Sequence, residues 1–297
     1  MAAFHVVACS NSYLLASRLA EKLGAPLVPV ERRWFPDGEL YLRLRGDPGR
    51  AVVVVQSLWP RPSEALLELL MVAGTLRERG VDKLVAVIPY MAYMRQDSEF
   101  NPGEVVSARR VAGLLDAAGF DLIVTVDMHL HRFSSPAELF KTPVANLTAA
   151  PLLVREALRR GAENPVIVGP DEEAEQWARA AAEAVGAEYT VFEKHRVSPD
   201  EVEVRPRDPG MVRGRDAVIV DDIISTGGTV ARAARLLLEA GARSVYVAVT
   251  HALLVQGALA KIHSSGVAAL YATDTVETPF STVTVSGILA ENLGNAA

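Results

Sequence analysis

The sequence predicts an α/β protein of two duplicated domains, each a doubly wound and mostly parallel sheet. Short apolar runs rich in valine and isoleucine alternate with longer segments of helical periodicity, the pattern of a parallel sheet covered on both faces. In addition, residues 24–31 (GAPLVPVE) match residues 186–193 (GAEYTVFE), and residues 80–90 match residues 241–251 at nearly the same spacing. Duplication of one α/β unit explains both matches, and chance similarity between generic strand–helix units is the alternative.

Composition fits a folded chain of this size. Its 297 residues are 50% hydrophobic and 22% charged, and we place the domains at residues 1–145 and 146–297. The net charge of −6 argues against nucleic acid and membrane surfaces as partners, because both require a basic face. One cysteine, Cys9, allows no intrachain disulfide, and the first residues lack a signal-peptide pattern, so we expect a cytoplasmic protein.

In the first half, buried strands alternate with amphipathic helices. The strands are expected at residues 5–9, 27–30, 51–55, 84–88 and 122–126. The helices are expected around residues 14–23, 64–79 and 105–118. Leu40, Leu42 and Leu44 alternate with Tyr41 and Arg43, which predicts a half-exposed antiparallel strand at a hairpin or a sheet edge.

The second half repeats this plan. Strands are expected at residues 166–168, 189–192, 217–220, 245–249 and 268–271. Helices are expected at residues 172–185, 229–240, 256–264 and 288–293.

Residues 218–229, VIVDDIISTGGT, give the clearest chemical signal. A buried strand ends in Asp221 and Asp222, and a Ser-Thr-Gly-Gly-Thr loop leads into a helix. Glycine allows close backbone approach, and free N–H groups at a helix start hold a phosphate, while the carboxylates can accept hydrogen bonds from vicinal hydroxyls. The segment therefore predicts a site for a phosphorylated ribose, and a turn whose aspartates only cap the helix is the alternative. It resembles the phosphoribosyl-diphosphate binding loop of proteins with the phosphoribosyltransferase fold.

Five other segments are weaker signals when taken singly. They are FPDGE at residues 35–39, RQD at 95–97, DMH at 127–129, GPD at 169–171 and EKHR at 193–196. Arginine suits a phosphate or a stacked base, and histidine near a carboxylate at a strand end can bind a metal. A plain hairpin, a solvated loop or a structural pair explains each of them equally well.

The order of these segments is more specific than any of them alone. The five segments are followed by DDIISTGGT and by TDT at residues 273–275. In this order they resemble the motifs of the ribose-phosphate diphosphokinase (phosphoribosyl-diphosphate synthetase) family, and the resemblance covers essentially the whole chain. The segments GPDEEA and STGGT are similar to the corresponding segments of archaeal members of this family. The resemblance implies two phosphoribosyltransferase-like (type I) domains, with ATP on the first, ribose 5-phosphate on the second, and the active site between them.

The family transfers the β,γ-diphosphoryl group of Mg-ATP to the 1-hydroxyl of ribose 5-phosphate, which gives 5-phosphoribosyl 1-diphosphate and AMP for nucleotide biosynthesis. The resemblance implies Mg²⁺ as the cofactor. It also implies a homodimer or a higher oligomer whose adenine site is shared between subunits.

The resemblance assigns roles to matching residues. The ATP-binding residues are expected to be Phe35, Asp37, Glu39, Arg95, Gln96 and His129. The ribose 5-phosphate site is expected to comprise Arg196, Asp221, Asp222, Ser225, Thr226, Gly227, Gly228 and Thr229. The expected magnesium ligands are His129 and Asp171, and the expected catalytic pair on a flexible loop is Lys194 and Arg196.

Two segments depart from the family pattern. Residues 130–133 (LHRF) replace a segment that contains glutamine in bacterial members, and residues 98–104 (SEFNPGE) are less basic than usual. These departures concern the details of ATP contact and of phosphate regulation rather than the reaction.

Two other functions are consistent with part of the pattern. A phosphoribosyltransferase uses the same loop, but it needs neither FPDGE nor RQD nor a first domain copy. A non-catalytic regulatory homologue would have lost part of the metal and cation set, whereas this sequence retains His129, Asp171, Lys194, Arg196 and Asp221.

Overall fold

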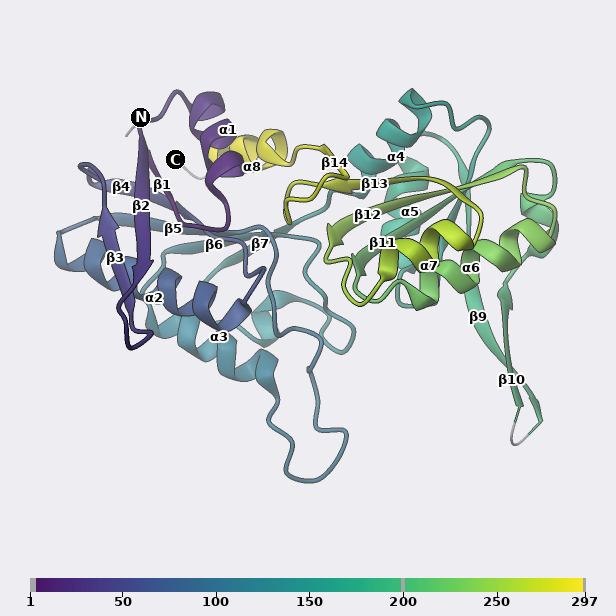
Figure 1. Cartoon of the computed structure of the whole chain (residues 1–297), viewed down its shortest axis with the longest axis horizontal. Helices are drawn as coiled ribbons and strands as arrows, with labels where there is room; N and C mark the ends of the chain where they lie inside the picture. Colours follow the sequence, from purple (N-terminus) through teal and green to yellow (C-terminus); the bar gives the residue numbers. More distant parts are fainter. Residues whose placement is uncertain (1–3, 199–200, 296–297) are drawn as a thin grey trace. The chain divides into compact units, whose positions relative to one another are not determined.

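The computed structural model describes residues 4–198 and 201–295, and for residues 194–198 and 201–204 it describes the backbone alone. The chain divides into two units, whose elements are labelled in Figure 1. Unit 1 comprises Met1–Leu147 and Thr284–Ala297, and unit 2 comprises Thr148–Val283. Within the described ranges, no helix is both long enough and apolar enough to span a membrane.

Unit 1 is built on a mostly parallel sheet with the strand order β3-β2-β1-β4-β5-β6-β7. The strands are β1 (His5–Ala8), β2 (Leu27–Trp34), β3 (Leu40–Leu44), β4 (Ala51–Val55), β5 (Lys83–Ile88), β6 (Leu122–Val126) and β7 (Val144–Leu147). Strand β3 is antiparallel to β2 and forms the sheet edge, which confirms the prediction from the alternating leucines. The valines of β4 are fully buried because helices cover both faces of the sheet.

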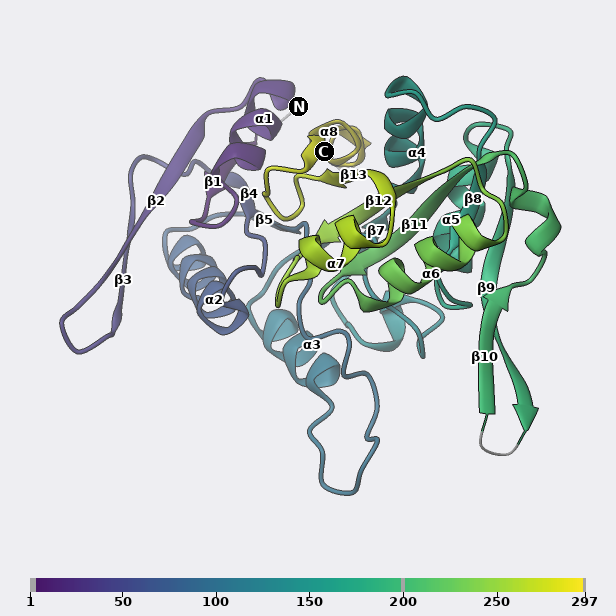
Figure 2. The same cartoon turned by 45° about the vertical axis from the view of Figure 1, so that its right-hand side comes forward.

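Helices of unit 1 lie on both faces of this sheet. They are α1 (Tyr13–Leu23), α2 (Pro62–Glu78), α3 (Ser107–Ala117), α8 (Ser286–Asn295) and the short 3₁₀ helix η1 (Pro136–Glu138). Helices α1 and α8 pack against each other on one face, while α2 and α3 cover the other (Figures 1 and 2).

Unit 2 repeats the sheet with the order β10-β9-β8-β11-β12-β13-β14. The strands are β8 (Val166–Gly169), β9 (Glu188–Ser198), β10 (Glu201–Pro206), β11 (Asp216–Ile224), β12 (Ser244–Ala252), β13 (Val267–Thr273) and β14 (Ser281–Val283). The helices are α4 (Ala150–Arg159), α5 (Glu175–Glu183), α6 (Gly228–Glu239), α7 (Ala258–Ser264) and the 3₁₀ helix η2 (Pro209–Val212). Helices α6 and α7 cover one face and α4 and α5 the other (Figure 2).

The two sheets have the same strand order, so β1–β7 correspond one to one with β8–β14. Strand pairing makes this correspondence specific to residues. Ala51 of β4 pairs with Lys83 of β5, and Asp216 of β11 pairs with Ser244 of β12. Lys83 and Ser244 hold the same place in the matched sequence repeat. The fold therefore confirms the predicted pair of duplicated α/β units.

The last helix, α8, belongs to a different unit from the one that the sequence-based boundaries gave it. We placed residues 146–297 together, but α8 packs on α1 and belongs to unit 1. The duplication gives the reason. In unit 2 the helix before the first strand, α4, packs on α5, which corresponds to α1. In unit 1, α8 packs on α1 and covers the equivalent apolar face.

Some elements were not predicted. Helix α4 and the short edge strands β7 and β14 were missed, and β9 and β10 form a hairpin much longer than the expected strand at residues 189–192. The edge strands contain only four and three residues, too few to show a periodic pattern in the sequence alone.

Candidate active site

In unit 2, two carboxylates lie at the end of β11. The Oδ1 atom of Asp221 accepts the N–H of Asp222 at 3.0 Å, and Oδ1 of Asp222 accepts the N–H of Ile223 at 2.7 Å. Asp222 is 3% exposed. Both side chains are therefore held against the backbone of β11, two to three residues before this strand ends at Ile224.

The third carboxylate follows the neighbouring strand. Asp171 comes after β8, which pairs with β11, and its Oδ1 accepts the N–H of Ala174 at 3.0 Å. Burial, together with the negative charges of Asp222 and Asp171, raises the pKa of Asp221 well above its ordinary value. A cation or a hydroxyl donor beside Asp221 would relieve this repulsion.

The loop after these carboxylates opens helix α6. Gly227 precedes the helix with φ of 73°, and a Cβ atom there would lie 3.2 Å from the carbonyl oxygen of Ala258 in α7. A Cβ atom on Gly228 would meet nothing within 4 Å. Within the described residues, no side chain caps the start of α6, so its first N–H groups are available to an anion.

A cavity of about 460 Å³ lies beside this helix start. Asp171, Gly228, Thr229 and Arg232 contribute to its lining. Arg232 was not predicted to take part in the site, although its position one turn into α6 places a cation near the predicted phosphate loop. The residues lining the cavity thus combine anionic and cationic groups.

The chemistry of these donors fits magnesium bound together with a substrate. In the described part of the chain, no group of three or more His, Cys, Asp and Glu side chains is placed to hold a metal by itself. Mg²⁺ commonly takes one or two carboxylates and completes its shell with water and substrate phosphates. The carboxylates of Asp171 and Asp221 match that requirement.

The predicted catalytic pair lies on β9. The backbone of Lys194 pairs with Val204 and that of Arg196 with Val202, so both belong to the β9–β10 hairpin. Their side chains lie outside the described residues. At the base of the hairpin, Arg207 contacts Glu193 and forms an ion pair with Glu175 of α5 at 3.3 Å.

In unit 1, FPDGE forms the tight turn between β2 and β3. The N–H of Phe35 donates to the carbonyl of Glu39 at 2.8 Å, and Oδ1 of Asp37 accepts the N–H of Glu39 at 3.1 Å. Gly38 has φ of 93°, a conformation that favours glycine. The Phe35 ring is 47% exposed and meets Tyr41 edge to face at 5.9 Å. The turn therefore presents an aromatic ring and two carboxylates to the outside of the unit.

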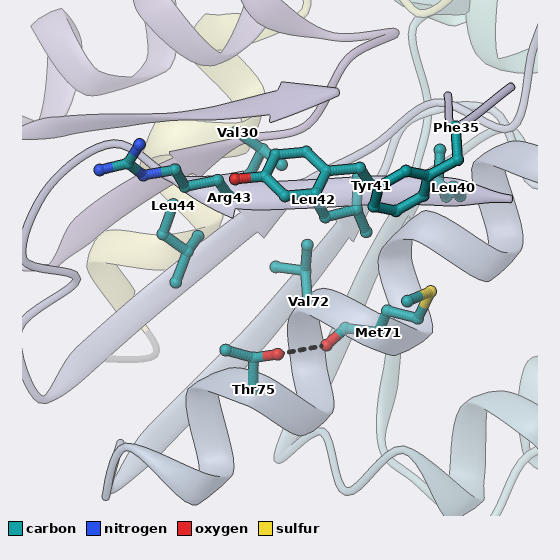
Figure 3. Close-up of a pocket in the computed structure, with 10 residues that line it drawn as sticks. All are labelled: Val30, Phe35, Leu40, Tyr41, Leu42, Arg43, Leu44, Met71, Val72 and Thr75. Atoms are coloured by element: carbon teal, nitrogen blue, oxygen red, sulfur yellow. Dashed lines mark hydrogen bonds between the residues drawn. The ribbon is translucent and has the colours of Figure 1, made fainter. Parts of the chain in front are cut away.

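A pocket of about 280 Å³ lies between this hairpin and helix α2. Figure 3 shows Phe35 and Tyr41 from the hairpin on one side, with Met71, Val72 and Thr75 of α2 on the other. The lining is largely apolar, which suits a flat ring better than a phosphate.

The RQD segment follows β5. Arg95 is exposed, and the Gln96 amide donates to Glu104 at 3.4 Å. Hydrogen bonds from Asn101 lower the pKa of Glu104, which also accepts the N–H of Phe100 at 3.0 Å. The unusual SEFNPGE segment is thus organised around Glu104, a residue to which the sequence analysis gave no role.

The DMH segment follows β6, the strand next to β5. Asp127 has φ of 40°, and the His129 and His131 rings meet at right angles with nitrogens 3.0 Å apart. Arg132 forms an ion pair with the buried Asp97 at 3.3 Å and so links this segment to RQD. The LHRF departure therefore supplies a contact between two predicted ATP-binding segments.

The strand order decides which predicted residues meet. In unit 2, Asp171, Asp221 and the loop at residues 225–229 lie together near the carboxyl-terminal ends of the parallel strands β8 and β11. In unit 1, the segments of Gln96 and His129 lie together, but β2 is three strand positions away from β5. At about 4.8 Å per strand this is roughly 14 Å, so Phe35 sits at the opposite side of the sheet from them.

The chain is similar to known proteins along nearly its whole length. The profile of the N-terminal domain of ribose phosphate pyrophosphokinase matches residues 4–119, and that of the phosphoribosyl transferase domain matches residues 145–267. The ribose-phosphate pyrophosphokinase of Methanothermobacter thermautotrophicus is 44% identical over 96% of this chain and 98% of its own. That of Methanopyrus kandleri is 43% identical over 98% of both chains. The crystal structure of phosphoribosylpyrophosphate synthetase from Mycobacterium smegmatis has a TM-score of 0.85, 30% identity and 98% coverage of both chains.

Proposed function

The chain belongs to the ribose-phosphate pyrophosphokinase family, and from that premise we propose how its residues carry out the reaction. The 1-hydroxyl oxygen of ribose 5-phosphate forms a bond to the β-phosphorus of ATP. The bond from that phosphorus to the α,β-bridging oxygen breaks, AMP leaves, and the hydroxyl proton is released. The product is 5-phosphoribosyl 1-diphosphate.

Ribose 5-phosphate is bound by the end of β11 and the start of α6. Asp221 and Asp222 accept hydrogen bonds from the ribose hydroxyls or hold their metal ion. The loop at residues 225–229 binds the 5-phosphate through free N–H groups and hydroxyls. One observation carries this assignment. The mutually repelling carboxylates of Asp171, Asp221 and Asp222 lie close to the start of α6, which, within the described residues, has no side-chain cap.

ATP is bound by unit 1. Phe35, Asp37 and Glu39 contact the adenine, and Arg95, Gln96 and His129 bind the rest of the nucleotide. The strand separation within one chain supports a shared site, because a hairpin from a second subunit can reach an ATP molecule held at β5 and β6. We therefore propose a homodimer or a larger assembly.

His129 would hold magnesium on the ATP side and Asp171 would hold it on the ribose side. There the metal would supply positive charge that neutralises the phosphates of the two substrates. Lys194 and Arg196 supply fixed cations for the charge that moves onto the α,β-bridging oxygen. The hairpin that carries them closes over the substrates and excludes water, which suppresses hydrolysis of ATP.

The protein acts in the cytoplasm, where its single cysteine and acidic net charge fit a metabolic enzyme. Nucleic acid and membranes are not partners in this proposal.

The test is to incubate the protein with Mg-ATP and ribose 5-phosphate and to follow nucleotides by chromatography. We expect AMP in strict dependence on the sugar, and a large loss of AMP with Asp221→Asn. Formation of ADP would indicate attack on the γ-phosphorus and contradict the proposal. AMP formed without the sugar would indicate ATP hydrolysis and contradict it as well.

A further inference from the structure

The duplication shows what unit 1 contains at the place of the unit 2 carboxylates. Ala51 corresponds to Asp216 in the two sheets. Five residues further on in each unit, Gln56 of unit 1 is therefore equivalent to Asp221 of unit 2. His5 pairs with Val52, as Val166 pairs with Ala217, so Ser10 stands level with Asp171. Unit 1 therefore has neutral side chains where unit 2 has carboxylates.

Helix α2 supplies the missing negative charge. Both α2 and α6 end two residues before a pair of matched glycines, Gly80 and Gly241. Twelve residues before each glycine, Glu68 of α2 is equivalent to Thr229 of α6. Thr229 lies in the first turn of α6, beside the proposed phosphate. The Glu68 carboxylate of unit 1 therefore stands at the position that corresponds to the proposed 5-phosphate of unit 2.

Glu68 is fully buried and its carboxylate is well bonded. It accepts the N–H of Ser10 at 2.9 Å, the hydroxyl of Ser10 at 2.5 Å and the amide of Gln56 at 3.0 Å. Nη1 of Arg32 completes the set at 3.3 Å. In unit 1 an internal carboxylate with its own donors therefore stands at the position where unit 2 is proposed to bind a phosphate.

The ion pair also reaches the ATP-binding hairpin. Arg32 lies on β2, its side chain is 19% exposed, and its guanidinium stacks over the Trp34 ring at 4.9 Å. Arg32 and Trp34 are two residues apart on one strand and share a face. Trp34 is the last residue of β2 and directly precedes Phe35. A chain of contacts thus runs from the buried carboxylate to the base of the FPDGE turn.

We propose that Glu68 is a positioning residue for ATP: it anchors Arg32 and Trp34, and thereby fixes the hairpin that presents Phe35, Asp37 and Glu39. This inference rests on the proposed adenine contact of the hairpin. The Glu68 carboxylate is buried and held by several hydrogen bonds, so it is a rigid anchor, and its removal frees Arg32.

The test compares Glu68→Gln and Arg32→Met with a matched control. Both variants are expected to raise the KM for ATP by roughly 3- to 30-fold and to change the KM for ribose 5-phosphate little. The double variant should be no worse than the single ones, because both remove the same link. The control is Asp216→Asn, which removes an equally buried carboxylate bound by Arg243 in unit 2 and should lower the melting temperature without changing either KM.

A second readout does not depend on activity. In a Trp59→Phe, Trp177→Phe background, Trp34 is the single tryptophan, and Glu68→Gln should increase quenching of its fluorescence by acrylamide. Unchanged quenching, or a lower melting temperature with an unchanged KM for ATP, would overturn the inference. Increased quenching in a protein that forms no AMP would support the link but refute the proposed function.

Discussion

Adjacent glycines at the start of α6 provide a sharp test, because the structure predicts opposite effects for them. Gly227 has φ of 73°, and its Cβ atom would lie 3.2 Å from both the carbonyl oxygen of Ala258 and Cγ1 of Ile262. The left-handed conformation costs an alanine about 1–2 kcal/mol, and crowding of this kind about 1–3 kcal/mol. We expect Gly227→Ala to lower the stability of unit 2 by about 2–5 kcal/mol.

Gly228 lies within α6, has no atom within 4 Å of an added Cβ, and lines the cavity beside the helix start. Alanine is the better helix former by up to about 1 kcal/mol, so Gly228→Ala should keep or raise stability. Its methyl group, however, would project where the 5-phosphate is proposed to approach the backbone. Loss of one charge-assisted hydrogen bond, about 1.5–3 kcal/mol, corresponds to a KM for ribose 5-phosphate roughly 10- to 150-fold higher.

Thermal unfolding and steady-state kinetics separate the two effects. Gly227→Ala should lower the melting temperature by roughly 4–20 °C. Gly228→Ala should unfold at or above the temperature of the parent chain and yet lose affinity for ribose 5-phosphate. A Gly228→Ala protein with an unchanged KM for ribose 5-phosphate would refute the assignment of this helix start to the phosphate.

Three further predictions concern other parts of the chain. Lys194→Ala should lower turnover about 10²- to 10³-fold, the scale for losing one preorganised charge, and near-normal turnover would exclude that role. Phe35→Ala should raise the KM for ATP more than that for ribose 5-phosphate, and equal effects would argue against an adenine contact. Hydrogen bonds from Arg243 lower the pKa of the buried Asp216 carboxyl, so its stabilising contribution is full above the ordinary aspartate pKa and is lost as the pH falls below it. Asp216→Asn should therefore make unfolding less sensitive to acid, and denaturant titrations at pH 3 and pH 7 that show the same sensitivity in both proteins would contradict this.

The sequence was most informative where burial dictates residue type. Strands β4 and β11 were predicted because continuous valine and isoleucine runs suit only a sheet covered on both faces. The hairpin strand β3 was predicted because Leu40, Leu42 and Leu44 alternate with polar neighbours. Helix α4 was missed although Ala150, Leu153, Val154 and Ala157 are buried at helical spacing, so its signal was present in the sequence.

Other features depend on contacts that only the folded chain makes. The packing of α8 on α1 follows from an apolar face that only the assembled sheet reveals. Edge strands β7 and β14 carry too few apolar residues to be recognised alone. Their place is fixed by pairing with β6 and β13.

The same division holds for the candidate site. The DDIISTGGT segment could be interpreted locally, because strand end, carboxylates, glycines and helix start are contiguous in sequence. The contact of Asp97 with Arg132, and the position of Glu68 in unit 1, required the fold. Glu68 belongs to no motif that marks it as part of a site, and Arg132 was noticed only as part of the LHRF departure from the family pattern.

The central claim is transfer of an intact diphosphoryl group, and ³¹P NMR of the reaction mixture tests it most directly. The account predicts AMP together with two mutually coupled phosphorus signals from a sugar 1-diphosphate, both absent when ribose 5-phosphate is left out. ADP together with a single uncoupled phosphate on the sugar C1 would contradict it.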